Sequence, residues 1–516
     1  MRTAAAEAAL ADGRAPVWLL TLTPPRGVPI RMSSEAIRVE TITAADGPYR
    51  FDPFLIGVDD YEESLDLAAL SAAVALASAR VEFTTTEDLA AMVSDWHFLG
   101  ASIAELATLW PGERWEDRLV LLRGNVQAST WGAAGEPCSL TLESAPEVTS
   151  AAAGDASRDI GADFVGATDT AGDDMTDLSG SEYPLILGRP RSANGYKIGE
   201  VGGNNRLVLC GHTLPSASTV EVSEDGGAAT SYTVSATTAD PIYSYVEHAT
   251  VFAAADGAYT WSAAASGGIA RADALTVGTR TAADVVRYLL HASGVRVDWA
   301  RMEPALRRLA GWEIGLFLDE AAPALDVLRE QLLPWLPVVE VPGGSGLWLA
   351  WADPYEAPIE ATLIAGQHLL GRLGGVEVTD RDAIRNRFTL AYARDEYLDE
   401  YAATVTLDAD TDPLCALSQQ LYGVLDDDPM ECPVVWTEQD ARRILRARAR
   451  RFALQRRRVR YVASPALYWL RAGAAVSLTD AGLGIAGQRA YVATMRRGGV
   501  LEVVLELVDA TPTGAL

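Results

Sequence analysis

The segment from Ser150 to Glu182 most constrains how this chain can fold. Alanine, glycine, serine, threonine and aspartate dominate it, with seven aspartates and almost nothing apolar. A segment of this composition cannot bury enough apolar surface to offset the conformational entropy lost on folding. Its aspartates also lack the loop pattern and the twelfth-position glutamate of a calcium-binding loop. We therefore expect a solvated linker or an extended arm that divides the chain into separate folding units.

The rest of the 516 residues is long enough for several domains. Strand-like and helix-like periodicities assign these regions: a β-rich domain at 1–149, the linker or arm at 150–182, a small β barrel or sandwich at 183–270, an α+β module at 271–360, and a C-terminal β-barrel domain at 361–516 that carries an arginine-rich helix at 438–453. The predicted fold class is therefore multidomain and mainly β, with one small helix–strand module.

The α+β module has the clearest helical pattern. Its first helix has an apolar stripe at Ala282, Val285, Val286, Leu289 and Leu290, with Thr281 as the expected N-cap. Two more helices are expected near Met302–Leu309 and Ala322–Leu332, the latter capped by Asp319 or Glu320. The strand Gly311–Leu318 and a hairpin of Val338–Val341 with Gly346–Trp351 complete the predicted module.

Composition and motifs point away from an enzyme. The 49% of hydrophobic and 22% of charged residues exclude wholesale disorder, and no apolar run reaches the ~18 residues of a membrane span. The N-terminus lacks the apolar core of a signal peptide, so we expect folding in a cytoplasm. The four cysteines and five histidines are dispersed, without metal-ligand spacing. We therefore expect no catalytic residue, no cofactor and no metal site.

Two motifs invite a functional interpretation but favour a structural one. Gly482–Gly487 matches G-x-G-x-x-G, yet the residues after it read as a strand, whereas a dinucleotide site needs a helix there. We expect a hairpin loop. Asp408, Asp410 and Asp412 alternate, but Pro413 stands where a calcium loop needs glycine, so we expect a solvated turn.

Charge is distributed unevenly along the chain. The net charge is −28, yet the residues from Ala441 to Leu516 contain 14 arginines and only four acidic residues. On the helix 438–453 an apolar stripe leaves arginines on the remaining face. We expect this face to meet acidic surface of another subunit or domain through Arg–carboxylate pairs, with a solvated face and phosphate binding as alternatives. The interface candidates are Arg442, Arg443, Arg446, Arg450, Arg451 and Arg457.

Several phrases resemble the tail hub proteins of long-tailed bacteriophages and gene transfer agents, which are similar in design to the trimeric baseplate hub of contractile tails. The phrases that carry the resemblance are Trp18–Thr23, Ile30–Ser33, Tyr49–Leu55, Tyr183–Gly188, Leu207–His212, Thr281–Val286, Gly311–Asp319 and Gly473–Asp480. Together they span nearly the whole chain, and none is a catalytic signature.

The resemblance implies a non-enzymatic structural role in a virion. Hub subunits form a ring, usually a homotrimer of barrel domains, that joins the tail tube to a central spike or fibre. The implied partners are other copies of this chain, distal tail or tube ring proteins, the tape-measure protein and the spike or fibre protein, with DNA only in transit. The implied location is the tail baseplate, assembled in the host bacterial cytoplasm.

Two other functions remain open at this point. The first is a hexameric distal tail ring protein of the same baseplate. The second is a glycan-binding or glycan-cleaving tail protein that uses tryptophans as sugar platforms, for which the candidates are Trp96, Trp110, Trp115, Trp312 and Trp335. Their apolar surroundings favour core packing instead.

Overall fold

The structure is a computed structural model of the whole chain. It describes residues 4–11, 14–24, 28–42, 48–64, 78–84, 102–130, 137–144, 185–188, 193–201, 204–210, 219–224, 230–233, 235–236, 244–248, 259–263, 281–318, 322–341, 346–353, 355–395 and 400–508. The expected linker at 150–182 and Trp96 lie outside these residues.

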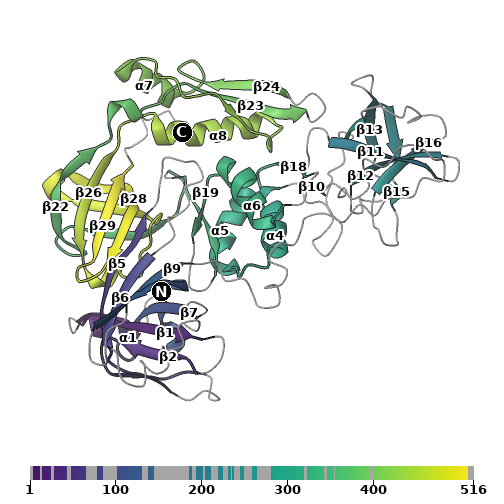
Figure 1. Cartoon of the computed structure of the whole chain (residues 1–516). Helices are drawn as coiled ribbons and strands as arrows, with labels where there is room; N and C mark the ends of the chain where they lie inside the picture. The colour runs from purple at the N-terminus through teal and green to yellow at the C-terminus, as the bar shows by residue number, and fades with distance from the viewer. Residues whose placement is uncertain are drawn as a thin grey trace.

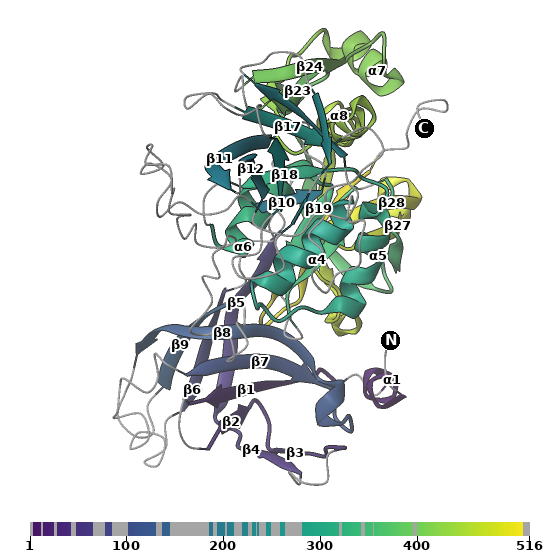
Figure 2. The ribbon, with the colours of Figure 1, turned by 90° about the vertical axis from the view of Figure 1, so that its right-hand side faces the viewer.

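One 13-stranded sheet joins the two ends of the chain (Figures 1 and 2). Its main path runs β2-β1-β7-β8-β9-β6-β5-β28-β29-β26-β22, and β27 pairs with both β21 and β28. The N-terminal and C-terminal halves meet where β5 pairs antiparallel with β28, through Tyr61–Ser64 opposite Thr494–Arg497. Residues from opposite ends of the sequence therefore share one hydrogen-bonded framework.

The N-terminal half begins with a short helix and is otherwise β. Its elements are α1 (Ala4–Ala11), β1 (Val17–Thr23), β2 (Ile30–Ser33), β3 (Ile37–Val39), β4 (Tyr49–Phe51), β5 (Leu55–Ser64), β6 (Ser78–Thr84), β7 (Ile103–Leu109), the 3-10 turn η1 (Trp115–Asp117), β8 (Leu119–Thr130) and β9 (Pro137–Ser144). Successive side chains of β1 point to opposite faces. Leu20 and Leu22 enter one buried cluster, and Val17 and Leu19 enter another, so both faces of this strand are covered.

The C-terminal half has its own core. Its elements are β21 (Ile359–Ile364), β22 (Leu369–Val378), β26 (Arg457–Ala463), the 3-10 turns η7 (Pro465–Leu467) and η8 (Ala481–Leu483), β27 (Ala475–Asp480), β28 (Ile485–Arg497) and β29 (Glu502–Leu507). Trp18 of β1 packs against this core as well as against the N-terminal one. The G-x-G-x-x-G run lies between β27 and β28, which pair antiparallel, so the predicted hairpin loop is confirmed.

A helical module packs against a second small sheet. The module contains α4 (Ala282–Ala292), α5 (Trp299–Leu309), β18 (Gly315–Leu318), α6 (Ala324–Asp326), the π-helical turn η4 (Val327–Leu332), the 3-10 turn η5 (Leu333–Trp335), β19 (Val338–Val341) and β20 (Trp348–Trp351). The second sheet has the order β24 (Glu400–Leu407), β23 (Phe388–Asp395), β25 (Met430–Glu431), and it is accompanied by the 3-10 turn η6 (Arg381–Ala383), α7 (Pro413–Tyr422) and α8 (Glu438–Phe452).

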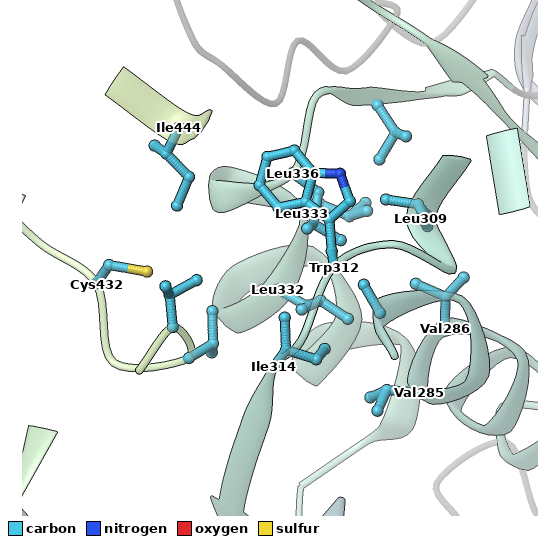
Figure 3. Close-up of a cluster of buried hydrophobic side chains, with 14 of the residues drawn as sticks. Val285, Val286, Leu309, Trp312, Ile314, Leu332, Leu333, Leu336, Cys432 and Ile444 are labelled. Atoms are coloured by element: carbon cyan, nitrogen blue, oxygen red, sulfur yellow. The ribbon is translucent and has the colours of Figure 1, made fainter. Parts of the chain in front are cut away.

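One hydrophobic cluster fills the space between these parts. Figure 3 shows its centre, where Trp312 and Ile314 of the module lie near Ile444 of α8 and Cys432. The cluster therefore contains residues from both sides of position 360, and the boundary predicted there falls inside β21.

A separate seven-stranded sheet has the order β14-β13-β17-β11-β12-β16-β15 (Figure 1, right). Its strands are β11 (Ala193–Val201), β12 (Asn204–Cys210), β13 (Thr219–Glu224), β14 (Thr230–Thr233), β15 (Ser235–Ala236), β16 (Ser244–His248) and β17 (Tyr259–Ala263). The preceding strand, β10 (Leu185–Gly188), does not join it and pairs with β18 of the helical module instead.

The prediction of a multidomain, mainly β chain with a small helix–strand module is confirmed. Two predicted N-caps are also confirmed. The side chain of Thr281 accepts a hydrogen bond from the amide of Asp284, and that of Thr437 accepts one from the amide of Asp440. The third helix begins later than predicted, and its expected caps, Asp319 and Glu320, lie outside the described residues. Pro323 occupies the N-cap of α6 without a side-chain hydrogen bond, and the helix passes after one turn into the π-helical η4.

Candidate functional site

The arginine-rich helix α8 lies between the sheet β24-β23-β25 and the helical module (Figure 1). Ile444, Leu445 and Ala449 form its buried stripe, as expected from their spacing. This stripe anchors α8 in the core. The arginines project from the rest of the helix, and the partners of each arginine can be assigned one by one.

Two of the candidate arginines bind other parts of the same chain. Arg450 donates to Asp353 Oδ2 at 2.8 Å and to Glu356 Oε1 at 2.8 Å, both just after β20. Burial would lower the pKa of Arg450, but these two carboxylates outweigh it and hold the pKa above its ordinary value. Arg443 donates to the carbonyl of Gly311 at 2.6 Å and to Asp440 at 2.8 Å. These contacts join α8 to the helical module.

The other four candidates differ in exposure. Arg442 pairs with Glu438 one turn earlier at 2.8 Å, and Arg457 donates to Gln488 at 3.3 Å. Arg451 is buried, at 7% exposure. Arg446 is exposed and forms no ion pair or hydrogen bond with the part of the chain that the structure describes. Arg446 is thus the candidate best placed for a second molecule, and the intersubunit role of the whole set stays a prediction.

A second arginine cluster follows α8 and surrounds a buried carboxylate. Glu506 of β29, at 2% exposure, accepts from Arg458 at 2.8 Å and from the hydroxyl of Tyr491 at 2.6 Å. Arg456 lies 3.5 Å from the same carboxylate and donates to the carbonyl of Arg451, the penultimate residue of α8. The end of the helix is therefore attached to the C-terminal sheet by charge-assisted hydrogen bonds.

A third cluster lies where the two halves of the large sheet meet. The carboxylate of Glu63, on β5, accepts hydrogen bonds from Arg471 and from the hydroxyl of Tyr61, and it forms an ion pair with Arg497 at 3.1 Å. Arg471 also donates to the carbonyl of Val120 at 2.6 Å, and Arg497 donates to that of Tyr468 at 3.2 Å. Arg497 is fully buried and Glu63 is 4% exposed. We call Tyr61, Glu63, Arg471 and Arg497 the junction cluster.

Charge pairing determines the ionisation of the junction cluster. Burial alone would raise the pKa of Glu63, but Arg471 and Arg497 outweigh it and hold that pKa below its usual range. Burial and the adjacent carboxylate raise the pKa of Tyr61, so its hydroxyl remains a donor. The charged groups are thus fixed as one anion with two cations, which holds β5 against the C-terminal half.

The end strand of the large sheet has an unusual surface. Nine of the ten residues of β22 are exposed, and the strand pairs with β26 alone among the described strands. Its exposed apolar residues are Leu370 (59%), Leu373 (38%), Val376 (38%) and Val378 (52%). Long apolar edge strands are normally protected, because their free N–H and C=O groups pair with other chains. The β22 edge is therefore a surface suited to another polypeptide.

The described residues contain no group of three or more His, Cys, Asp or Glu side chains that could hold a metal ion. No described helix is long and apolar enough to cross a membrane. In the Asp408–Asp412 turn, Asp412 has a structural role. It is the N-cap of α7, and its side chain accepts hydrogen bonds from the backbone amides of Leu414 and Cys415.

The tryptophan candidates divide between core and surface. Trp312 is buried, and Trp115 and Trp335 pack against hydrophobic clusters, as expected. Trp110 instead lines an open cleft.

No family model and no curated protein matches the sequence. Two solved structures resemble the fold weakly. A chain from the virion of a native gene transfer agent particle aligns with a TM-score of 0.43 and 16% identity, over 65% of this chain and 86% of that one. The tail protein from Neisseria meningitidis MC58 aligns with a TM-score of 0.39 and 9% identity, over 95% of this chain and 96% of that one. At these TM-scores the likeness is too weak to carry a functional argument.

The sequence did not point to the junction cluster or to the β22 edge. Nothing in the sequence relates Glu63 to Arg471, which stands 408 positions away. The composition of Leu369–Val378 is the available signal for the edge, because its leucines and valines are interspersed with glycines and charged residues and do not form a strict apolar alternation.

Proposed function

We propose that this chain is a structural tail protein of a phage or phage-like particle, and specifically its tail hub. In this role copies of the chain form a ring, as a homotrimer, at the baseplate of a virion assembled in the host bacterial cytoplasm. The ring joins the distal tail or tube proteins and the tape-measure protein to a central spike or fibre. The proposal starts from the sequence resemblance and is supported by the following features.

The β22 edge carries the proposal. A ten-residue strand with apolar side chains, whose second edge has no partner among the described strands, favours pairing with a second chain. The favoured occupant is a second copy of this chain, because a contact between two different surfaces of identical subunits closes into a ring when its rotation fits. The basic C-terminal region and the acidic remainder supply complementary charge for such a contact.

The junction cluster supports a rigid subunit. A ring that transmits force between a tube and a spike needs sheets that do not move independently. The β5–β28 pairing and the buried ion pairs of Glu63 supply that connection within one chain.

The overall charge suits passage of DNA. With a net charge of −28, the surface of the assembled ring repels phosphate unless arginines face its lumen. DNA would then pass through without being retained. A lumen lined by the arginines of α8 would contradict this part of the proposal.

The first test is the mass of the purified chain by native mass spectrometry. The expected result is a trimer of three 55.0 kDa subunits. A hexamer would favour the distal tail ring instead. A chain that stays monomeric at high concentration, both alone and after purified tails are added, would contradict the hub assignment.

Matched valine variants test the surface. Val378 on β22 and Val424 after α7 are both 52% exposed. Val378→Lys places a charge on the edge and should shift the trimer toward monomer, whereas Val424→Lys should leave it intact. Equal effects of the two variants, or no effect of either, would exclude β22 as the contact.

Location is tested separately by electron microscopy of particles labelled with antibody to this chain. The proposal expects label at the distal end of the tail. Label along the tail tube or on the head would contradict a baseplate role, whatever the mass in solution.

A further inference from the structure

A cleft of about 660 Å³ opens where the N-terminal half, the helical module and the C-terminal half meet. Its walls come from α1, the end of β7 and the turn after it, α5, β21, and the segment Pro465–Trp469. The volume falls within the roughly 300–1,000 Å³ typical of sites for small ligands, which often lie between domains. None of the features used for the proposed function occupies this cleft.

Three aromatic side chains line the cleft: Trp110, Tyr468 and Trp469. The backbone at Trp110 is held by a tight turn, in which its main-chain N–H donates to the carboxylate of Glu113 at 2.9 Å and Gly112 adopts a φ of 92°. The ring of Tyr468 packs edge-to-face on Trp18, with centroids 6.0 Å apart. The ring of Tyr468 is therefore supported by a contact behind it, and the backbone that carries Trp110 is held by its turn.

The arginines of the cleft are already paired. Arg118 forms a two-point contact with Glu105, at 2.7 and 3.2 Å, and stacks on Trp115. Arg301 lies 3.4 Å from Asp298. Since their charges are matched locally, neither is an open receptor for an anionic ligand.

The carboxylates of the cleft outnumber those arginines. Glu7, Glu113, Asp117 and Glu360 all contribute to the lining. Glu360 is reached by solvent, yet the surrounding protein raises its pKa by desolvation, and Arg301 offsets only part of that effect. The cleft therefore repels phosphates and acidic sugars, and it offers carboxylate oxygens as hydrogen-bond acceptors.

We propose that this cleft binds a neutral oligosaccharide. The C–H face of a sugar ring packs on a flat aromatic side chain, and its hydroxyls donate to carboxylates placed around the ring. Rigid aromatic rings with polar groups at their margins supply both contacts, with little loss of conformational freedom. A basic peptide would use the same carboxylates but has less need of three aromatic rings in the lining, so the saccharide is favoured.

Titration of the full-length chain tests the proposal. The probes are three neutral tetrasaccharides, those of N-acetylglucosamine, maltose type and mannose type, together with tetralysine. Binding is measured by calorimetry. Saturable binding of at least one saccharide is expected, with Kd raised tenfold or more by Trp110→Ala and by Glu360→Gln.

Two matched variants serve as controls. Tyr422→Ala removes an aromatic ring at the end of α7, and Glu400→Gln neutralises an exposed carboxylate at the start of β24. Both should bind as the unchanged chain does. Circular dichroism of all four variants separates loss of binding from loss of fold, and Glu360→Gln preserves shape if Trp110→Ala does not fold.

Three results would overturn the proposal: no binding of any tetrasaccharide at millimolar concentration, saccharide binding that the cleft variants leave unchanged, or binding of tetralysine alone with loss in Glu360→Gln. The last would identify a peptide site. The oligomeric state plays no part in this readout, so the hub assignment and the saccharide site fail or succeed independently.

Discussion

Glu63 Oε1 and Arg497 Nη1 lie 3.1 Å apart in a site where both side chains are buried. Glu63 belongs to β5 and Arg497 to the end of β28, so the pair crosses the meeting point of the two halves of the large sheet. Arg471 binds the same carboxylate, and two cations thus depend on one anion. Removing that anion has consequences that can be measured.

Glu63→Gln should lower the free energy of unfolding by about 3–5 kcal/mol, because it leaves two buried guanidinium groups without their counter-charge. The measurement is the midpoint of the first transition in urea. Glu62→Gln is the matched control, since Glu62 is the preceding residue of β5 and is exposed. Equal midpoints for the two variants would contradict a stabilising role for the junction cluster.

The same carboxylate predicts acid sensitivity. The pKa of Glu63 is lowered in the folded chain, so its contribution is fully present above the ordinary glutamate pKa and is lost as the pH falls through the lower, folded value. The difference in urea midpoint between the unchanged chain and Glu63→Gln should therefore shrink as the pH is lowered from about 6 to about 3. If the difference in urea midpoint grew as the pH was lowered, the pKa of Glu63 would be raised in the folded chain and the prediction would be wrong.

The arginines of α8 should differ in function. Arg450→Ala leaves the buried Asp353 without its ion pair and should cost roughly 1.5–3 kcal/mol of unfolding free energy. Arg446→Ala should change stability by less than about 0.5 kcal/mol, since Arg446 is exposed. If the face of α8 that carries Arg446 contacts a second copy of the chain, the same variant should also make the oligomer dissociate at a higher protein concentration in a dilution series. An oligomer insensitive to Arg446→Ala would exclude that residue from the contact.

Two thiols should be unreactive in the folded chain. Burial, with nearby Asp412, raises the pKa of Cys415 to about 12, and burial raises that of Cys432 to about 12. Iodoacetamide at about pH 8 should therefore leave both unlabelled until urea is added, as read by mass spectrometry of the peptides. Rapid labelling of either cysteine without denaturant would contradict its burial.

Asn386 should be essential to the loop after α7. Its fully buried amide donates to Ser418 at 3.0 Å and to the carbonyl of Gly423 at 2.8 Å, and accepts from the amide of Leu425 at 2.8 Å. Asn386→Leu leaves these groups unsatisfied and should cost about 2–4 kcal/mol. Thr389→Val, at a half-buried polar position on β23, is the control and should cost less. If Asn386→Leu and Thr389→Val had similar unfolding midpoints, water would be replacing the hydrogen bonds of the Asn386 amide, and the prediction would be wrong.

The sequence determined the local elements wherever period and capping chemistry agree. The stripe of α4, its Thr281 cap, the span of α8 and the hairpin after β27 follow from contacts within a few residues, which a sequence displays directly. It also identified the arginine helix and the order of the β-rich and helical regions. It missed α7, whose short length and weak apolar stripe gave no clear period.

Only the tertiary structure decided which distant residues meet. Glu63 lies beside Arg471 and Arg497 because β5 pairs with β28, and no local preference encodes a pairing between opposite ends of a chain. The same pairing order leaves β22 as an end strand and brings Trp110, Glu360 and Tyr468 to one cleft. A strand's periodicity says which side chains share a face, but its neighbours depend on how the whole sheet closes around its cores.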